Sequence, residues 1–121
     1  MKPVLIKIEY PGSVISVNHY KHAGGMYTKK EAIEWATHLG WEMKMYHFED
    51  WKLPLEVKCS GYFVNERSAP DISNLAKLIL DELEEVTQIN DRNFRWRDGV
   101  RDVGHTKEPY LIICVREVEE C

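Results

Sequence analysis

Apolar and polar residues alternate along four stretches of the chain, as they do in β-strands that bury one face. The four stretches are residues 4–10, 54–65, 92–103 and 108–119. The last of them, EPYLIICVREVE, has the strongest strand pattern, and the third alternates mainly through Phe94 and Trp96. The pattern therefore predicts four strands, one near the start of the chain and three beyond residue 50.

Two other segments repeat apolar residues every three or four positions, which predicts helices with one buried face. The first helix follows Thr28-Lys29-Lys30-Glu31, a capping-box pattern in which the threonine and glutamate side chains bind backbone N–H groups. Its apolar side consists of Ile33, Ala36, Leu39, Met43 and Tyr46. The second helix is expected over about residues 71–86, and its apolar side consists of Ile72, Leu75, Ala76, Ile79, Leu83 and Val86.

The elements follow one another as strand, helix, strand, helix, strand, strand, with a long loop before the first helix. Two turns compete to join the last two strands: Asp98-Gly99, a frequent hairpin turn, and the loop 104–109. The chain shows no repeat, low-complexity tract or linker. This order over 121 residues predicts a single α+β domain that spans residues 1–121.

Composition and charge argue against a disordered chain and against a protein that coats nucleic acid without selectivity. Apolar residues make up 44% of the chain, charged residues 30%, and the net charge is −4. Residues 92–107 nevertheless form a basic stripe of Arg92, Arg95, Arg97, Arg101 and Lys107, interrupted by Asp98 and Asp102. The stripe fits either a phosphate-binding surface or a solvated strand face, and charge alone favours the solvated face.

Several common kinds of site are not indicated by the sequence. Cys59, Cys114 and Cys121 form no CxxC pair, so neither a disulfide framework nor a zinc ribbon is expected. His19 and His22 lack a carboxylate or cysteine at ligand spacing, which argues against a transition-metal site. No nucleotide-binding motif, signal peptide or membrane span is found, so we expect a cytoplasmic protein without an organic cofactor.

The start of the second helix holds the polar residues that could carry chemistry. Asp71, Asn74 and Lys77 fall on one face of this helix. A metal-dependent nuclease needs carboxylate oxygens for a hard cation and a positive group near the phosphate, and Asp71 with Lys77 offers one of each. The alternative is structural: the Asp71 carboxylate then caps the helix.

Two aspartates farther along are candidates for a second carboxylate. Asp81 lies about 15 Å along the helix from Asp71, too far to share an ion, and is expected to pair with Lys77 four residues before it. Asp91 follows the helix in the loop INDRN, and we expect the chain to return it to the helix start. Asn90-Asp91 is also a common turn former, so a purely structural role stays open.

Three motifs together resemble the RusA-type Holliday junction resolvases, a family of small endodeoxyribonucleases. SVNHY resembles the loop motif of the family, with matches at Ser16, Asn18 and Tyr20. DISNLAKLILDEL resembles the helix motif, with matches at Asp71, Asn74, Leu75, Lys77, Asp81 and Leu83. INDR resembles the acidic segment before the final hairpin and places the downstream acid on Asp91. The likeness runs over nearly the whole chain.

The resemblance implies a mixed sheet with two helices, and a homodimer that binds a four-way DNA junction and nicks two strands symmetrically. It implies that Asp71, Lys77 and Asp91 are catalytic: the two aspartates bind Mg²⁺, and the lysine neutralises charge that develops on the phosphate. The implied DNA contacts are Asn18, Tyr20, Lys21, Asn74, Lys77, Arg92 and Arg95. Trp51 and Tyr62 are candidates for the dimer interface.

One departure from the family motif bears on activity. The second aspartate of the helix motif is Ser73 here, and a neutral hydroxyl binds a hard cation more weakly than a carboxylate does. Glu66, in the loop before the helix, is a candidate substitute ligand. The alternative function is therefore a weakened or inactive RusA-like protein that binds branched DNA. A small interaction protein without a nucleic-acid role would require the motif match to arise by chance.

Overall fold

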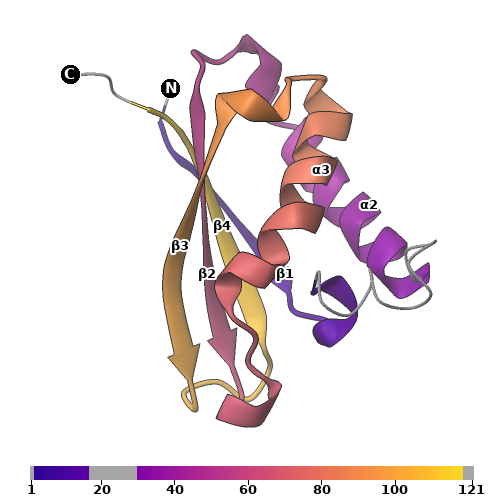
Figure 1. The fold of residues 1–121 in the computed structure, drawn as a ribbon, viewed down its shortest axis with the longest axis vertical. Coiled ribbons are helices and arrows are strands. Elements are labelled where there is room, and N and C mark those ends of the chain that lie inside the picture. The colour runs from indigo at the N-terminus through magenta and orange to yellow at the C-terminus, as the bar shows by residue number, and fades with distance from the viewer. Residues whose placement is uncertain (1, 17–29, 119–121) are drawn as a thin grey trace.

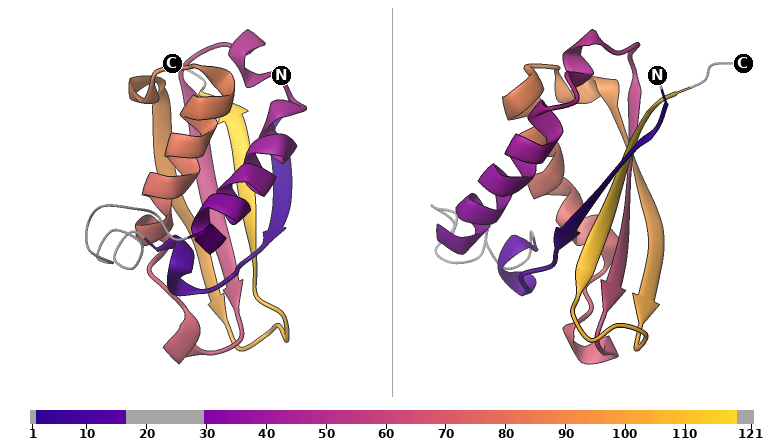
Figure 2. Two further views of the ribbon diagram at one scale, coloured as in Figure 1. Left: turned by 90° about the vertical axis from the view of Figure 1, so that its right-hand side faces the viewer. Right: turned by 180° about the vertical axis from the view of Figure 1, so that it is seen from behind.

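The computed structural model describes residues 2–16 and 30–118, in which four strands and two α-helices form two layers (Figure 1). The strands are β1 (Val4–Glu9), β2 (Leu55–Phe63), β3 (Phe94–Val103) and β4 (Tyr110–Glu117), and the helices are α2 (Lys30–Lys44) and α3 (Ala76–Thr87). Both helices lie on one face of the sheet, and Figure 2 shows the described helices leaving the other face uncovered. The α+β class and the order of elements are as predicted. None of the described helices is long and apolar enough to cross a bilayer.

The strands lie in the order β1-β4-β2-β3, so β3 is at one edge of the sheet. β2 pairs with β3 in parallel, whereas β4 is antiparallel to both of its neighbours, and the sheet is mixed as the resemblance implies. Asp98 and Gly99 lie inside β3, so the turn before β4 is in the loop 104–109. The last two strands do not form a hairpin with each other, because β2 lies between them.

The crossover between the two parallel strands decides where the candidate residues lie. Parallel neighbours cannot be joined by a tight turn, so the chain must travel back along the sheet before β3 begins. It does so through two short 3₁₀ segments, η3 (Glu66–Ser68) and η4 (Ile72–Leu75), then α3, then a further 3₁₀ segment, η5 (Asp91–Asn93). Asp71 is the residue before η4, and Asp91 is the first residue of η5.

The buried faces of the two helices test the predicted apolar patterns. On the second helix the pattern is confirmed, since the buried residues include Ile72, Leu75, Ile79 and Leu83. On the first helix the buried residues include Ala32, Trp35, Ala36, Leu39 and Met43. Here the prediction is partly wrong, because Ile33 is 53% exposed and Tyr46 lies beyond the end of α2. The Trp35 Nε1–H donates to the carbonyl oxygen of Glu9 at 2.8 Å, which ties the observed face of α2 to β1.

Gly61 on β2 leaves room for the residues that begin the second helix. A Cβ atom at this position would overlap the ring of Phe63 and lie 2.9 Å from Cδ1 of Ile72. We expect Gly61→Ala to lower the free energy of unfolding by about 1–3 kcal/mol, because buried neighbours must shift to admit the methyl group. Urea denaturation measures the change. In a Phe63→Leu background the ring tip is absent and the same substitution should cost less, so an equal cost in both backgrounds would contradict this explanation.

Candidate functional site

The helix-start motif lies at the surface, where the chain enters η4. Asp71 has an extended backbone, and its carbonyl oxygen accepts a hydrogen bond from the Asn74 N–H at 3.0 Å. Its side chain is exposed and forms no capping hydrogen bond, and Ser73 is exposed as well. The carboxylate cap that was the structural alternative is therefore not formed. The Asp71 carboxylate stays at the surface, where a ligand can approach it.

Lys77, on the first turn of α3, forms the ion pair that its spacing predicts. Its Nζ is 3.1 Å from Oδ1 and 3.0 Å from Oδ2 of Asp81. Both side chains are about half exposed, so solvent screens the pair and its contribution to stability is small. A phosphate group that approached Lys77 would compete with Asp81 for the same ammonium group.

Arg101 on β3 holds the segment that leads to Asp71, a role that the sequence pattern does not reveal. Its Nε donates to the carbonyl oxygen of Pro70 at 2.9 Å. Its Nη2 donates, also at 2.9 Å, to the carbonyl oxygen of Ala69 and to Oε1 of Glu66. The hydrogen bond from Arg101 holds the pKa of the Glu66 carboxyl below its ordinary value. Glu66, the candidate substitute ligand, is thus already engaged by an arginine of the same chain.

A bulge in β3 explains why Arg101 reaches the helix side of the sheet. Asp98 pairs with Cys59 and Arg101 pairs with Gly61, so two residues of β3 oppose one residue of β2 between these pairs. The extra residue shifts the alternation of side chains by one position. Even-numbered residues face the helices before the bulge, and odd-numbered residues do so after it. A strict alternation read from the sequence places Arg101 on the wrong face.

Asp91 lies at the opposite end of α3 from Asp71. Its N–H donates to Oε2 of Glu84 at 2.8 Å, near the end of the helix. α3 has 12 residues and is therefore about 18 Å long. The prediction that the loop returns Asp91 to the helix start is wrong, because β3 begins at the end of the sheet where its parallel neighbour β2 begins. The turn-forming role of this segment is present: the Asn90 side chain accepts a hydrogen bond from the Arg92 N–H at 3.0 Å.

Within one protomer, the described residues do not fit the magnesium site that the resemblance implies. Mg²⁺ binds oxygen ligands at about 2.0–2.1 Å, so two carboxylates at opposite ends of α3 cannot share one ion. Among residues 2–16 and 30–118, no group of three or more His, Cys, Asp or Glu side chains is placed to hold a metal ion. A site that contains both Asp71 and Asp91 must take them from different copies of the chain.

The predicted DNA contacts divide between described and undescribed segments. Residues 17–29 lie outside the described residues, and they include the predicted contacts Asn18, Tyr20 and Lys21. The same segment contains His19, His22 and the capping-box residue Thr28. Asn74 is half-buried, whereas Arg92 and Arg95 are exposed. Nη1 of Arg95 donates to the carbonyl oxygens of Arg92 at 2.6 Å and Phe94 at 3.4 Å. The Arg95 side chain is therefore held close to the start of β3.

The uncovered face of the sheet carries a buried glutamate between two arginines. Glu56 on β2 accepts hydrogen bonds from Nη1 of Arg97 at 3.1 Å and from Nε of Arg116. Only 8% of Glu56 is exposed. The hydrogen bond from Arg116, supported by Arg97, holds the pKa of this carboxyl below its ordinary value despite the opposing effect of burial. Arg97 thus neutralises a carboxylate of its own chain, and the basic stripe is less positive than its sequence suggests.

The two aromatic residues suggested for a dimer interface differ in exposure. Trp51 is buried and packs edge-on against Phe48, with ring centroids 4.8 Å apart, so it belongs to the core of the protomer. Tyr62 is half-buried on the uncovered face and stacks on Tyr110, also at 4.8 Å. Tyr62 is therefore the better placed of the two to meet a partner.

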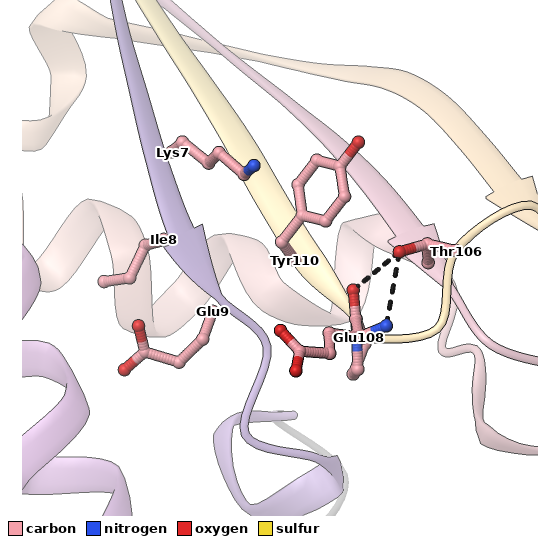
Figure 3. A pocket seen from close by; sticks show the side chains of 7 residues that line it. Lys7, Ile8, Glu9, Thr106, Glu108 and Tyr110 are labelled. Atoms are coloured by element: carbon pink, nitrogen blue, oxygen red, sulfur yellow. Dashed lines mark hydrogen bonds between the residues drawn. The ribbon is translucent and has the colours of Figure 1, made fainter.

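An open pocket of about 400 Å³ lies between the end of β1 and the start of β4 (Figure 3). It is lined by Lys7, Ile8, Glu9, Thr106, Glu108, Pro109 and Tyr110. The Lys7 ammonium lies 4.4 Å from the centre of the Tyr110 ring, and the Thr106 hydroxyl donates to the carbonyl oxygen of Glu108 at 2.8 Å. Of the predicted catalytic and DNA-binding residues that the structure describes, none lines this pocket, so it is separate from the helix-start motif.

Comparison with known protein families matches residues 11–113 to Endodeoxyribonuclease RusA. The match covers most of the chain and includes both the helix-start motif and Asp91. The chain belongs to the RusA endodeoxyribonuclease family. The resemblance seen in the motifs is thereby confirmed, and with it a relation to nucleases that generally depend on divalent metal ions.

Other comparisons add little about this RusA-family protein. No curated protein matches its sequence. Among solved structures, an IspF–CDP complex from Plasmodium falciparum is similar to 69% of this chain and 55% of that chain, with 15% sequence identity and a TM-score of 0.35. The chain thus spans little more than half the length of that structure, and a similarity this low supports no conclusion about fold or activity.

Removal of the Arg101 side chain should loosen the segment before Asp71. Arg101→Ala loses the three hydrogen bonds to residues 66–70, so the hydrogen-bonded backbone amides of Ser68 and Ala69 should exchange with deuterium several-fold faster than in the parent. Arg95→Ala is the matched control, because the Arg95 guanidinium binds carbonyl groups near its own position in the sequence. Unchanged exchange in Arg101→Ala would show that something else orders this segment.

Glu56 should contribute to the acid sensitivity of the fold. Since its pKa is lowered in the folded protein, its stabilising effect is present above the unfolded-state pKa and is lost as pH falls through the folded-state pKa. Glu56→Gln should therefore be less stable at pH 7 and lose less stability between pH 7 and acid conditions than the parent. Urea denaturation as a function of pH tests this, with Glu108→Gln, an exposed loop substitution, as control. Parallel stability curves for parent and Glu56→Gln would contradict it.

Proposed function

We propose that this protein is a Mg²⁺-dependent endodeoxyribonuclease that resolves four-way DNA junctions by paired, symmetric nicks as a homodimer. The observation that carries the proposal is the family match over residues 11–113 together with the exposed, uncapped carboxylate of Asp71. A surface carboxylate six residues before a lysine suits phosphodiester hydrolysis better than it suits a structural cap. DNA recombination and repair are the processes that such an activity serves.

Each catalytic residue has a proposed role that its position allows. Asp71 and Asp91 are the proposed Mg²⁺ ligands, contributed by different protomers because one protomer holds them at opposite ends of α3. Lys77 is proposed to neutralise negative charge on the phosphate, for which its ammonium group must exchange Asp81 for the substrate. The proposed DNA contacts are Asn18, Tyr20, Lys21, Asn74, Lys77, Arg92 and Arg95.

The alternative function is a catalytically weakened protein that binds branched DNA, and two observations favour it. Ser73 is exposed beside Asp71 and supplies only a neutral hydroxyl oxygen. Glu66, the candidate to replace the missing carboxylate, forms an ion pair with Arg101 at 2.9 Å. A metal bound at the helix start would therefore have to break that pair to gain Glu66 as a ligand.

A gel assay on a synthetic four-way junction, with and without Mg²⁺, separates the two functions. The nuclease should produce paired nicks only when Mg²⁺ is present. A shifted junction band without products, at any Mg²⁺ concentration, would support the binding protein instead. If the junction is neither bound nor cut, both functions are wrong. A linear duplex of the same sequence is the control for structure selectivity.

A mixing experiment tests whether the two carboxylates come from different protomers. Asp71→Asn and Asp91→Asn should each be inactive alone, because an amide is a poor ligand for a hard cation. When the two variants are mixed and allowed to exchange subunits, each heterodimer regains one intact site, and about a quarter of the parent nicking rate should return.

The control for mixing is the double variant Asp71→Asn/Asp91→Asn combined with either single variant. These heterodimers have no intact site under the two-protomer arrangement and should stay inactive. If subunits exchange and no mixture regains activity, the two-protomer site is wrong. Either both carboxylates then act within one protomer, or one of them is not a metal ligand.

A further inference from the structure

The edge of the sheet formed by β3 is an exposed surface with an ordered arrangement of charges. β3 has 10 residues and, among the strands that the structure describes, pairs with β2 alone, as Figure 1 shows. An edge strand presents backbone N–H and C=O groups that can pair with a further strand. Arg95 and Asp102 lie near opposite ends of β3 and carry opposite charges. This combination suits a second strand that runs in the opposite direction.

The bulge in β3 reverses which residues of the strand face the helices, so odd-numbered residues before it lie on the same face as even-numbered residues after it. Before the bulge, Arg95 stands beside Glu56 in the strand register, and its side chain lies on the uncovered face of the sheet. After the bulge, Asp102 pairs with Tyr62, which lies on the same face. The odd-numbered Arg95 and the even-numbered Asp102 therefore share a face. In an antiparallel pair of two β3 strands, these residues can stand directly opposite each other.

We infer that two copies of this chain associate through antiparallel pairing of their β3 strands, with Arg95 opposite the partner's Asp102. A two-fold axis perpendicular to the sheet makes the interface isologous, so this charge pair occurs twice. The described strands of the two copies become one continuous sheet of eight strands, and their described α-helices, α2 and α3 of each copy, lie on the same side of it. The inference rests on the homodimer of the proposed function and names the surface that forms it.

The neighbouring positions support the same register. With Arg95 opposite the partner's Asp102, Phe94 stands opposite the partner's Val103, and both of these residues belong to the helix side of the sheet. Arg97 is held by Glu56, so Arg95 is the arginine better able to meet the partner's aspartate. Asp102 lies 3.1 Å from Nδ1 of His105, an exposed contact that a guanidinium group can replace.

The pairing also moves the two candidate carboxylates to one end of the assembly. Antiparallel strands place the start of the partner's β3 beside the end of β3, where Arg101 holds the segment before Asp71. The partner's Asp91 lies three residues before the first residue of the partner's β3. It therefore comes to the same end of the sheet as Asp71, whereas the two aspartates of one protomer are separated by the length of α3.

The direct test exchanges the charges of Arg95 and Asp102. Sedimentation equilibrium of the full chain measures the Kd of the dimer for each variant. Arg95→Glu and Asp102→Arg should each raise the Kd of the dimer roughly tenfold, because each places like charges opposite one another at two positions. The double variant Arg95→Glu/Asp102→Arg should return the Kd close to the parent value. Lys58→Glu makes the same charge change on the same face of β2, away from the edge, and should leave the Kd unchanged.

Three results would overturn the inference. One is a parent protein that stays monomeric at every attainable concentration. Another is a dimer whose Kd is unaffected by either single substitution, and the third is a double variant no better associated than the single ones.

Thermal melting of each variant confirms that it is folded. Sedimentation reads association alone, so loss of nicking with intact charge exchange would count against the nuclease and not against the interface. A monomer that loses junction binding in Arg95→Glu would assign this edge to DNA instead.

Discussion

The parallel pairing of β2 with β3 is the constraint on which the arrangement of the candidate site depends. Parallel neighbours begin at the same end of a sheet, so the segment between them must run back along its length, and α3 does so. The helix therefore separates the two halves of the nuclease motif, with Asp71 before it and Asp91 after it. An antiparallel pair would have joined these carboxylates through a short connection. Topology, and not the local motif, decides that one protomer holds half of each proposed site.

The bulge in β3 is the second feature that organises the charged residues. It sends Arg97 to the uncovered face, where Glu56 binds it, and Arg101 to the helix side, where it holds the segment before Asp71. Three arginines that look equivalent in the sequence therefore have three different partners. Among the described residues, Arg95 is the one of the three that donates to carbonyl groups alone, and carbonyl groups leave its positive charge uncompensated. A local excess of positive charge in the sequence is thus a poor guide to where a polyanion can bind.

The features that could be predicted from the sequence are those set by local spacing. The buried stripe of α3 and the ion pair between Lys77 and Asp81 depend on residues three or four positions apart, and both are present. The features that were missed depend on contacts between distant parts of the chain. The face that α2 turns toward the sheet depends in part on the hydrogen bond from Trp35 to Glu9, 26 residues away. The hydrogen bonds of Arg101 join residues 31 to 35 positions apart. No periodic pattern carries such information, because strand order and register decide it.

A site divided between two protomers would give a physical reason for the proposed paired cleavage. A monomer would hold Asp71 and Asp91 at opposite ends of α3 and could assemble no complete site, whereas an isologous dimer assembles two at once. The two sites would be related by the same two-fold symmetry that a four-way junction possesses, so equivalent strands would meet equivalent carboxylates. Cleavage would then be tied to association, and the concentration of dimer would set the rate. Such coupling would protect DNA from single nicks, because a dissociated protomer would hold no complete site and could not cut a strand.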